Sequence, residues 1–256
     1  LGMLPPGDIR NCIMSLANTE PTMQKLLNYR FTEGSLSGQS FGNLFLAAMN
    51  GISGSFDEAV HRMGDVLAIT GRVLPVTNQN VHLEAEFDNG SRCLGESKIF
   101  YAKKLNDCRI RKIRLVPEHP QPLPDALDAI ADADVIVLGP GSLYTSIIPN
   151  FLVDGISEAV SRAQALKCYV LNIMTQDGET DGYTAADHIK AIFAHAGVDV
   201  MDVCIANSRR VSAEFLEPYE KEGVQQLMAG AEEVEQLGVA LREFPVCTPG
   251  RYIRHN

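Results

Sequence analysis

The sequence lacks three features that mark common classes of protein: closely spaced cysteines, a long apolar run and an excess of basic residues. Its six cysteines are scattered, so neither a zinc site nor a disulfide framework is indicated, and we expect a reduced, cytoplasmic protein. No segment approaches the roughly 20 apolar residues that cross a bilayer. Acidic residues outnumber basic ones by 32 to 22, so we expect no nucleic-acid binding through a basic surface and no membrane partner.

Two catalytic signatures are also missing. No Walker motif is present, so ordinary ATP hydrolysis has no support. Ser142 follows Gly-Pro-Gly instead of lying between spaced glycines, so no nucleophile elbow is indicated. What the chain does have is 256 residues with ordinary fractions of hydrophobic and charged residues, which predicts a single α/β domain over residues 1–256.

The second half of the chain alternates apolar strands with amphipathic helices. We predict strands at residues 134–138, 168–173 and 200–206, and helices at 123–131, 151–162 and 185–196. Strands that are apolar throughout are typical of parallel sheets covered on both faces. The order therefore predicts a doubly wound, mostly parallel sheet.

The region of about residues 70–115 has a different pattern. Residues 72–75, 81–87 and 91–99 alternate between apolar and polar, and Asp88-Asn89-Gly90 joins the last two stretches. This pattern predicts an antiparallel hairpin insertion, serving as a lid or an oligomer contact. Helices are expected before it, near residues 8–18, 21–29, 40–50 and 56–68.

The most informative segment follows the strand at 134–138 and runs from Gly139 to Ser146. Gly139 and Gly141 flank a proline, and Ser142, Thr145 and Ser146 supply hydroxyl groups before the next helix. A glycine-rich turn between strand and helix is where open α/β sheets place phosphate-bearing ligands, because the backbone amides can approach an anion. The alternative is a tight turn whose hydroxyls only cap the helix.

A second polar segment, residues 172–184, follows the next strand. Asn172 and Thr175 could form hydrogen bonds to a nucleotide or sugar. Asp177, Glu179 and Asp181 either coordinate magnesium or are simply solvated.

Two earlier segments have similar chemistry at helix starts. Asp8 caps a helix or contributes to a ligand site with Arg10 and Asn11. Ser40 caps the next predicted helix with Asn43 three positions on. Gly42 within that helix indicates a close approach, either by another helix or by a ligand.

Four motifs carry a family resemblance: GDIRN, SGQSFGNL, LGPGSLYTSIIPN and NIMTQDGETDGYTAADH. Together they resemble the bacterial gluconeogenesis factor family, which is related to 2-phospho-L-lactate transferase. The resemblance implies a Rossmann-like three-layer fold and a cytoplasmic protein needed for growth and cell shape on gluconeogenic carbon sources. It also implies binding of UDP-activated sugars such as UDP-N-acetylglucosamine, and a regulatory role through contacts with cell-wall synthesis proteins. We further expect a homo-oligomer.

The resemblance and the motifs together define the candidate ligand residues. Tyr219 would stack on the base or else pack as an ordinary aromatic, and Arg254 would bind a diphosphate or else be a surface charge. The full candidate set is Gly139, Gly141, Ser142, Leu143, Tyr144, Thr145, Asn172, Thr175, Tyr219 and Arg254, with Asp8, Arg10, Asn11, Ser40 and Asn43 as a second set. No metal ligand and no catalytic residue is assigned.

Members of both families begin with a strand, a glycine-rich turn and an aspartate pair, and end with a further helix, and we expect these parts to be missing here. The runner-up function is a magnesium-dependent transferase that moves a phosphate-linked group from a nucleoside diphosphate donor. An NAD(P)-binding protein, argued from the fold alone, is a third alternative.

Overall fold

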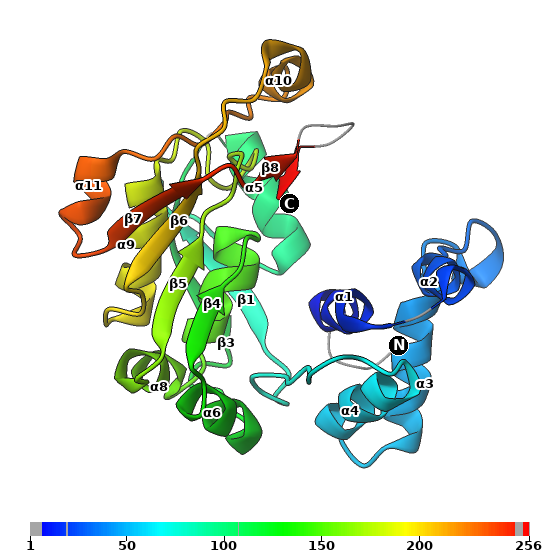
Figure 1. Ribbon diagram of the computed structural model, residues 1–256. Helices are drawn as coiled ribbons and strands as arrows, with labels where there is room; N and C mark the ends of the chain where they lie inside the picture. Colours follow the sequence, from blue (N-terminus) through cyan, green and yellow to red (C-terminus); the bar gives the residue numbers. More distant parts are fainter. Residues whose placement is uncertain (1–6, 19, 107, 249–252, 256) are drawn as a thin grey trace. The chain divides into compact units, whose positions relative to one another are not determined.

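A computed structural model describes residues 7–18, 20–106, 108–248 and 253–255. The chain forms two compact units (Figure 1). The first comprises residues 1–80 with 122–126, and the second comprises residues 81–121 with 127–256. Two compact units can belong to one domain, so the single domain over residues 1–256 stays a prediction.

The first unit contains a small helical core. Its helices are α1 (Gly7–Leu16), α2 (Pro21–Asn28), the short η1 (Gly34–Leu36), α3 (Phe41–Ile52) and α4 (Phe56–Val66), close to the predicted ranges. Apolar side chains from all four longer helices form one buried cluster that includes Ile13, Leu27, Leu46 and Met63. The helix starts follow local rules: Ser40 accepts from the amide of Asn43 and caps α3.

The second unit is built on a parallel sheet, as predicted. Its strands β4 (Val135–Leu138), β5 (Leu166–Val170), β6 (Val203–Asn207) and β7 (Ala240–Phe244) lie in the order β4-β5-β6-β7 and are all parallel. The edge strand β7 was missed, because its burial pattern leaves only Leu241 fully buried and no apolar run marks it. The α/β class of the prediction is confirmed.

Helices connect these strands. They are α6 (Pro124–Ala131), α8 (Ile156–Arg162), α9 (Ala185–Ala196), α10 (Ala213–Glu220) and α11 (Ala231–Glu235). The single helix predicted at 151–162 is wrong, because a π turn η2 (Leu143–Ile147) and α7 (Ile148–Phe151) come first and Gly155, with φ 77°, separates them from α8. None of the helices in the described part of the chain has the length and apolarity needed to cross a bilayer.

The predicted antiparallel insertion is present as a three-stranded sheet. Strands β1 (His82–Phe87), β2 (Arg92–Leu94) and β3 (Ile110–Val116) lie in the order β2-β1-β3, and the 88–90 turn joins the first two. The strand predicted over 91–99 ends at Leu94, since Gly95 has φ 106° and the chain continues as helix α5 (Glu96–Asn106). Residues 72–75 form no strand.

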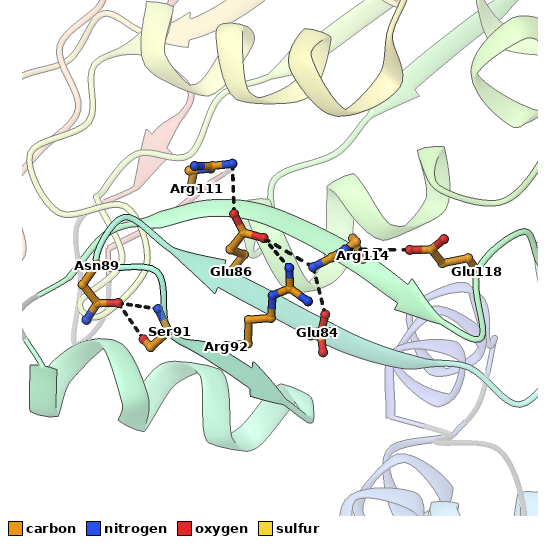
Figure 2. Close-up of polar contacts among 8 residues, drawn as sticks. All are labelled: Glu84, Glu86, Asn89, Ser91, Arg92, Arg111, Arg114 and Glu118. Carbon is orange, nitrogen blue, oxygen red and sulfur yellow. Dashed lines mark hydrogen bonds and ion pairs between the residues drawn. The ribbon is translucent and has the colours of Figure 1, made fainter.

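One face of this antiparallel sheet is charged and the other is apolar. Glu86 is paired with Arg92, Arg111 and Arg114, while Arg114 also reaches Glu84 and Glu118 (Figure 2). Residues between them in sequence, including Ala85 and Ile113, are buried. Arg92 and Arg111 are exposed, whereas Glu86 and Arg114 are partly buried. Solvent weakens such ion pairs, so the buried apolar face is the main contribution that holds the insertion in place.

Gly42 allows close helix packing in the first unit. A Cβ at this position would lie 2.8 Å from the carbonyl oxygen of Leu27 and 2.9 Å from Cδ of Arg10. The close approach predicted from the sequence is therefore helix packing. Gly51, on the same helix, has open space where a Cβ would be.

Gly42→Ala is expected to lower the free energy of unfolding by about 1–3 kcal/mol, because the added methyl group overpacks this contact. Gly51→Ala, the matched control, is expected to raise it by up to about 1 kcal/mol through helix propensity. Urea unfolding of the two variants measures both values. Equal stability of the two variants would show that α3 does not need a glycine at position 42.

Candidate functional site

The predicted turn and the predicted polar loop meet at the carboxyl edge of the parallel sheet. They follow β4 and β5, which are neighbours and parallel. The amide of Gly141 donates to Oδ1 of Asn172 at 3.0 Å, and Nδ2 of Asn172 donates to the carbonyl of Gly141 at 2.8 Å. This reciprocal pair joins the two segments, so two of the candidate residues hold each other in place.

Within the turn, Ser142 caps η2. Its Oγ accepts from the amide of Thr145, and its carbonyl accepts from the amides of Ser146 and Ile147. Added Cβ atoms at Gly139 and Gly141 would meet nothing closer than 3.8 Å, so the protein itself does not require glycine there. Capping and ligand binding by this turn are therefore compatible. The Ser142 hydroxyl caps η2, while the space beside Gly139 and Gly141, where a side chain would lie, is not filled by other described residues.

The partner of this turn is Glu179, which the sequence suggested only as a magnesium ligand or a solvated acid. The Glu179 side chain is buried, and its two carboxylate oxygens lie 2.6 and 2.7 Å from Oγ of Ser142. One of them also accepts from the amide of Tyr144 at 2.7 Å. A negative charge at amides that begin a helical turn is favourable, and here the protein supplies that charge itself.

This contact changes what the turn can offer to a ligand. The amides of Gly141 and Tyr144 are bonded to protein side chains, whereas those of Ser142 and Leu143 have no hydrogen-bond partner among the described residues. With a carboxylate ion as acceptor, the Ser142 hydroxyl donates to Glu179 and the Thr145 hydroxyl, 2.5 Å away, donates to Ser142. Contacts of this turn with a ligand stay a prediction.

A cluster of aromatic side chains, with Tyr144 buried and Tyr183 and His195 partly buried, packs against the turn. The hydroxyls of Tyr144 and Tyr183 are 2.7 Å apart, and the ring of His195 packs edge-on against Tyr144. His195 donates from Nδ1 to the carbonyl of Ala191 and accepts at Nε2 from the amide of Ile113 in β3. Accepting at Nε2 requires a neutral ring, and burial lowers the pKa of His195 accordingly.

Tyr219 and Arg254 come together at the same edge of the sheet. Tyr219 is on α10, and its hydroxyl accepts from the amide of Ile253 at 3.0 Å, directly before Arg254. Arg254 lies in β9 (Arg254–His255), which pairs with β8 (Cys247–Thr248). His255 donates from Nε2 to the carbonyl of Leu171 at 3.0 Å, beside Asn172. Figure 1 shows α10 and β8 beyond this end of the sheet.

Thr175 is brought to this edge as well, but its polar groups are used locally. Its amide donates to the carbonyl of Gln225, and its Oγ1 accepts from the amide of Gln225, both at 2.8 Å. The side chain is buried. Its role in ligand binding stays a prediction, whereas its role in holding the segment at 225–227 against the sheet is direct.

The second set of candidates lies in the first unit. Arg10 donates from Nη1 to Oγ of Ser40 at 3.0 Å and from Nη2 to Oδ1 of Asn11 at 2.6 Å. Nε of Arg10 and Oδ1 of Asn43 are buried without a partner among the described residues, so one donor and one acceptor are available. Asp8 lies in the first turn of α1. The structure thus gathers Arg10, Asn11, Ser40 and Asn43.

The acidic residues of the 172–184 loop do not converge on one point. Glu179 is bonded to the turn, and Asp181 accepts from the amide of Gly178 at 3.1 Å. Within the described ranges, no group of three or more His, Cys, Asp or Glu side chains is placed to hold a metal ion. A magnesium site built from three of these carboxylates is therefore not seen among the described residues, and magnesium binding by fewer protein ligands stays a prediction.

Two further cations follow β6. Arg209 donates from Nη1 to the carbonyl of Cys247 at 3.2 Å, while Asn207 holds the Arg209 backbone through both of its side-chain atoms. Arg210 is exposed. The rule applied to the first two strands, that polar groups directly after a parallel strand face the ligand edge, would have identified both arginines.

A cavity of about 500 Å³ opens beside the turn. It lies between α5, β3, the turn and the loop after β5. Its lining residues are Glu96, Ser97, Ile99, Ile110, Thr145, Gln176, Gly178 and Glu179. The volume is within the range of small-molecule sites.

Comparisons with known proteins agree with the motifs. The family model for 2-phospho-L-lactate transferase CofD matches residues 1–247. A putative gluconeogenesis factor of Thermoanaerobacterium thermosulfurigenes is 52% identical over 257 residues, covering 100% of this chain and 79% of that protein. The gluconeogenesis factor of Bacillus subtilis is 44% identical over 255 residues, covering 98% and 79%.

A solved structure is also similar. The crystal structure of a member of the UPF0052 family from Bacillus halodurans superimposes with a TM-score of 0.94 at 41% identity. The match covers 98% of this chain and 80% of that one.

Two histidines, the buried His188 and the partly buried His195, predict a pH dependence of stability. Burial lowers the pKa of both His188 and His195, whereas in the unfolded chain each takes up a proton near its ordinary value of 6.5. Their contribution to the free energy of unfolding is therefore complete above pH 6.5 and is lost as the pH falls through the depressed folded-state pKa values.

Urea unfolding at about pH 7.5 and about pH 5.5 measures this loss. His195→Gln is expected to reduce the difference between the two pH values. The exposed control His119→Asn is expected to retain it. An undiminished difference in His195→Gln would contradict the assignment of His195 as a neutral acceptor.

Proposed function

The chain belongs to the gluconeogenesis factor family, which is related to 2-phospho-L-lactate transferase, and from this premise we propose that it is a regulatory protein that binds a UDP-sugar of the UDP-N-acetylglucosamine type. We place its action in the cytoplasm, in growth and cell shape under gluconeogenic conditions, through contacts with cell-wall synthesis proteins. The observation that carries the proposal is the placement of Tyr219 beside Arg254 at the edge where the turn after β4 meets Asn172.

The residues at this edge have the chemistry that a nucleoside diphosphate requires. The guanidinium of Arg254 can donate two parallel hydrogen bonds to phosphate oxygens. Arg209 and Arg210 place further positive charge after β6, next to the β8–β9 pair. The ring of Tyr219 offers a stacking surface for uracil. The amides of Ser142 and Leu143 are the donors remaining at the turn.

Binding without turnover is favoured by the arrangement of the candidate nucleophiles. Between described residues, no histidine is hydrogen-bonded to a serine, threonine or cysteine side chain. Ser142, one of the two serines at the turn, donates to a carboxylate and caps η2. The observed effect of this contact is to hold the Ser142 hydroxyl within the turn.

The family model of the transferase supports a second candidate, a transferase that moves a phosphate-linked group from a nucleoside diphosphate donor. It predicts conversion of the nucleotide sugar beyond one turnover on prolonged incubation with magnesium. Chromatography of the nucleotide distinguishes the two functions. An unchanged UDP-sugar supports the binding function, whereas conversion beyond one turnover would contradict it and support the transferase function.

Arg254→Ala is expected to weaken UDP-N-acetylglucosamine binding by on the order of 1.5–3 kcal/mol, the loss of a charge-assisted contact. Arg162→Ala, an exposed arginine at the end of α8, is the matched control and should bind normally. Titration calorimetry measures both.

Two substitutions of Tyr219 separate stacking from positioning. Tyr219→Phe keeps the ring but removes the acceptor for the Ile253 amide, whereas Tyr219→Ala removes both. A larger loss of affinity in Tyr219→Ala, of about 1–3 kcal/mol, indicates stacking on the base. Unaltered affinity in Arg254→Ala and Tyr219→Ala alike would place the ligand elsewhere.

A further inference from the structure

The cavity beside the turn has walls that donate and accept hydrogen bonds and a floor that is apolar. Ile99 and Ile110 are buried and form the apolar part. Ser97 and Thr145 contribute hydroxyls, and Gln176 contributes an amide. Such a combination fits a small ring that is rich in hydroxyl groups, because its polar edges find partners and its face lies on hydrocarbon.

The described part of the cavity lining carries negative charge. Among the described residues that line it, the charged ones are Glu96 and Glu179, both carboxylates. Carboxylates accept strong hydrogen bonds from hydroxyl groups. They repel phosphate and carboxylate groups, and this repulsion is larger in a partly desolvated site than in water.

The carboxylate of Glu179 is held where it is. It accepts from Oγ of Ser142 and from the amide of Tyr144, and the side chain is only 4% exposed. Turning it away would leave two donors of the turn without their acceptor, which is costly in a buried place. A ligand anion therefore does not displace the Glu179 carboxylate from the start of η2 without this cost.

The cations of this edge lie after other strands. Arg209 and Arg210 follow β6, and Arg254 follows β7, whereas the cavity is formed after β4 and β5. Since the sheet order is β4-β5-β6-β7, negative and positive groups occupy successive parts of one edge. A ligand with a diphosphate at one end and an uncharged ring at the other matches this order.

We propose that the cavity lined by Glu96, Thr145 and Glu179 binds the sugar ring of the nucleotide sugar and selects uncharged sugars over sugar acids. The proposal rests on the proposed function and adds to it the charge class of the sugar. The diphosphate points away from the cavity, toward Arg254. Glu179 has two roles, as the acceptor that orders the turn and as the charge that excludes an acidic sugar.

The test compares UDP-glucose with UDP-glucuronate, which differ only in a hydroxymethyl group against a carboxylate, and includes UDP alone. Titration calorimetry of the whole chain is expected to show UDP-glucose binding more tightly than UDP-glucuronate by about tenfold or more, as like charges in a partly desolvated site require. Glu179→Gln and Glu96→Gln are expected to narrow this ratio. Asp132→Asn, a carboxylate ahead of β4 at the opposite edge, should leave it unchanged.

A steric variant keeps the test independent of the turn. Ser97→Phe, at an exposed position of α5, fills the cavity from its rim. In this variant UDP-glucose should bind no more tightly than UDP, while the affinity for UDP itself is retained. Equal binding of both sugars with no effect of the three cavity variants would overturn this inference and leave the proposed function intact. Failure of UDP and both UDP-sugars to bind would overturn both.

Discussion

The contact on which the candidate site depends is the buried carboxylate of Glu179 against the turn after β4. It satisfies the hydroxyl of Ser142 and the amide of Tyr144, groups that an open α/β sheet usually directs at a bound anion. Together with the reciprocal Asn172–Gly141 pair, it joins the ends of two parallel strands into one rigid corner. This corner fixes the positions of the other polar groups at the same edge of the sheet.

The corner is stiff because it is supported on two sides. Behind it, Tyr144 and Tyr183 share a hydrogen bond, and His195 connects α9 to the backbone of β3. Beside it, Ile253 and His255 are held by hydrogen bonds to Tyr219 and Leu171. A binding edge preorganised in this way loses little conformational freedom when a ligand arrives.

The edge is also divided by charge. Carboxylates surround the cavity next to β4 and β5, whereas arginines follow β6 and β7. Glu179, Arg209 and Arg254 come from segments that follow parallel strands, whereas Glu96 comes from helix α5. The charges of Glu179 and Arg209 differ in sign, and each side chain pairs with a backbone group of matching polarity. Glu179 accepts from an amide, and Arg209 donates to the carbonyl of Cys247.

The sequence by itself determined the elements whose signals are local. The apolar runs gave β4, β5 and β6, the Asp88-Asn89-Gly90 turn gave the hairpin, and the range of α9 follows from the Thr184 capping box and Gly197 at its end. It also identified Asn172, Tyr219 and Arg254 as candidates, two of them through the family resemblance. Tertiary structure alone decided the length of β2, the existence of the edge strand β7 and the role of Glu179. That role could not be read from the sequence, because a carboxylate 37 residues from Ser142 becomes its partner only when parallel pairing brings the two strand ends together.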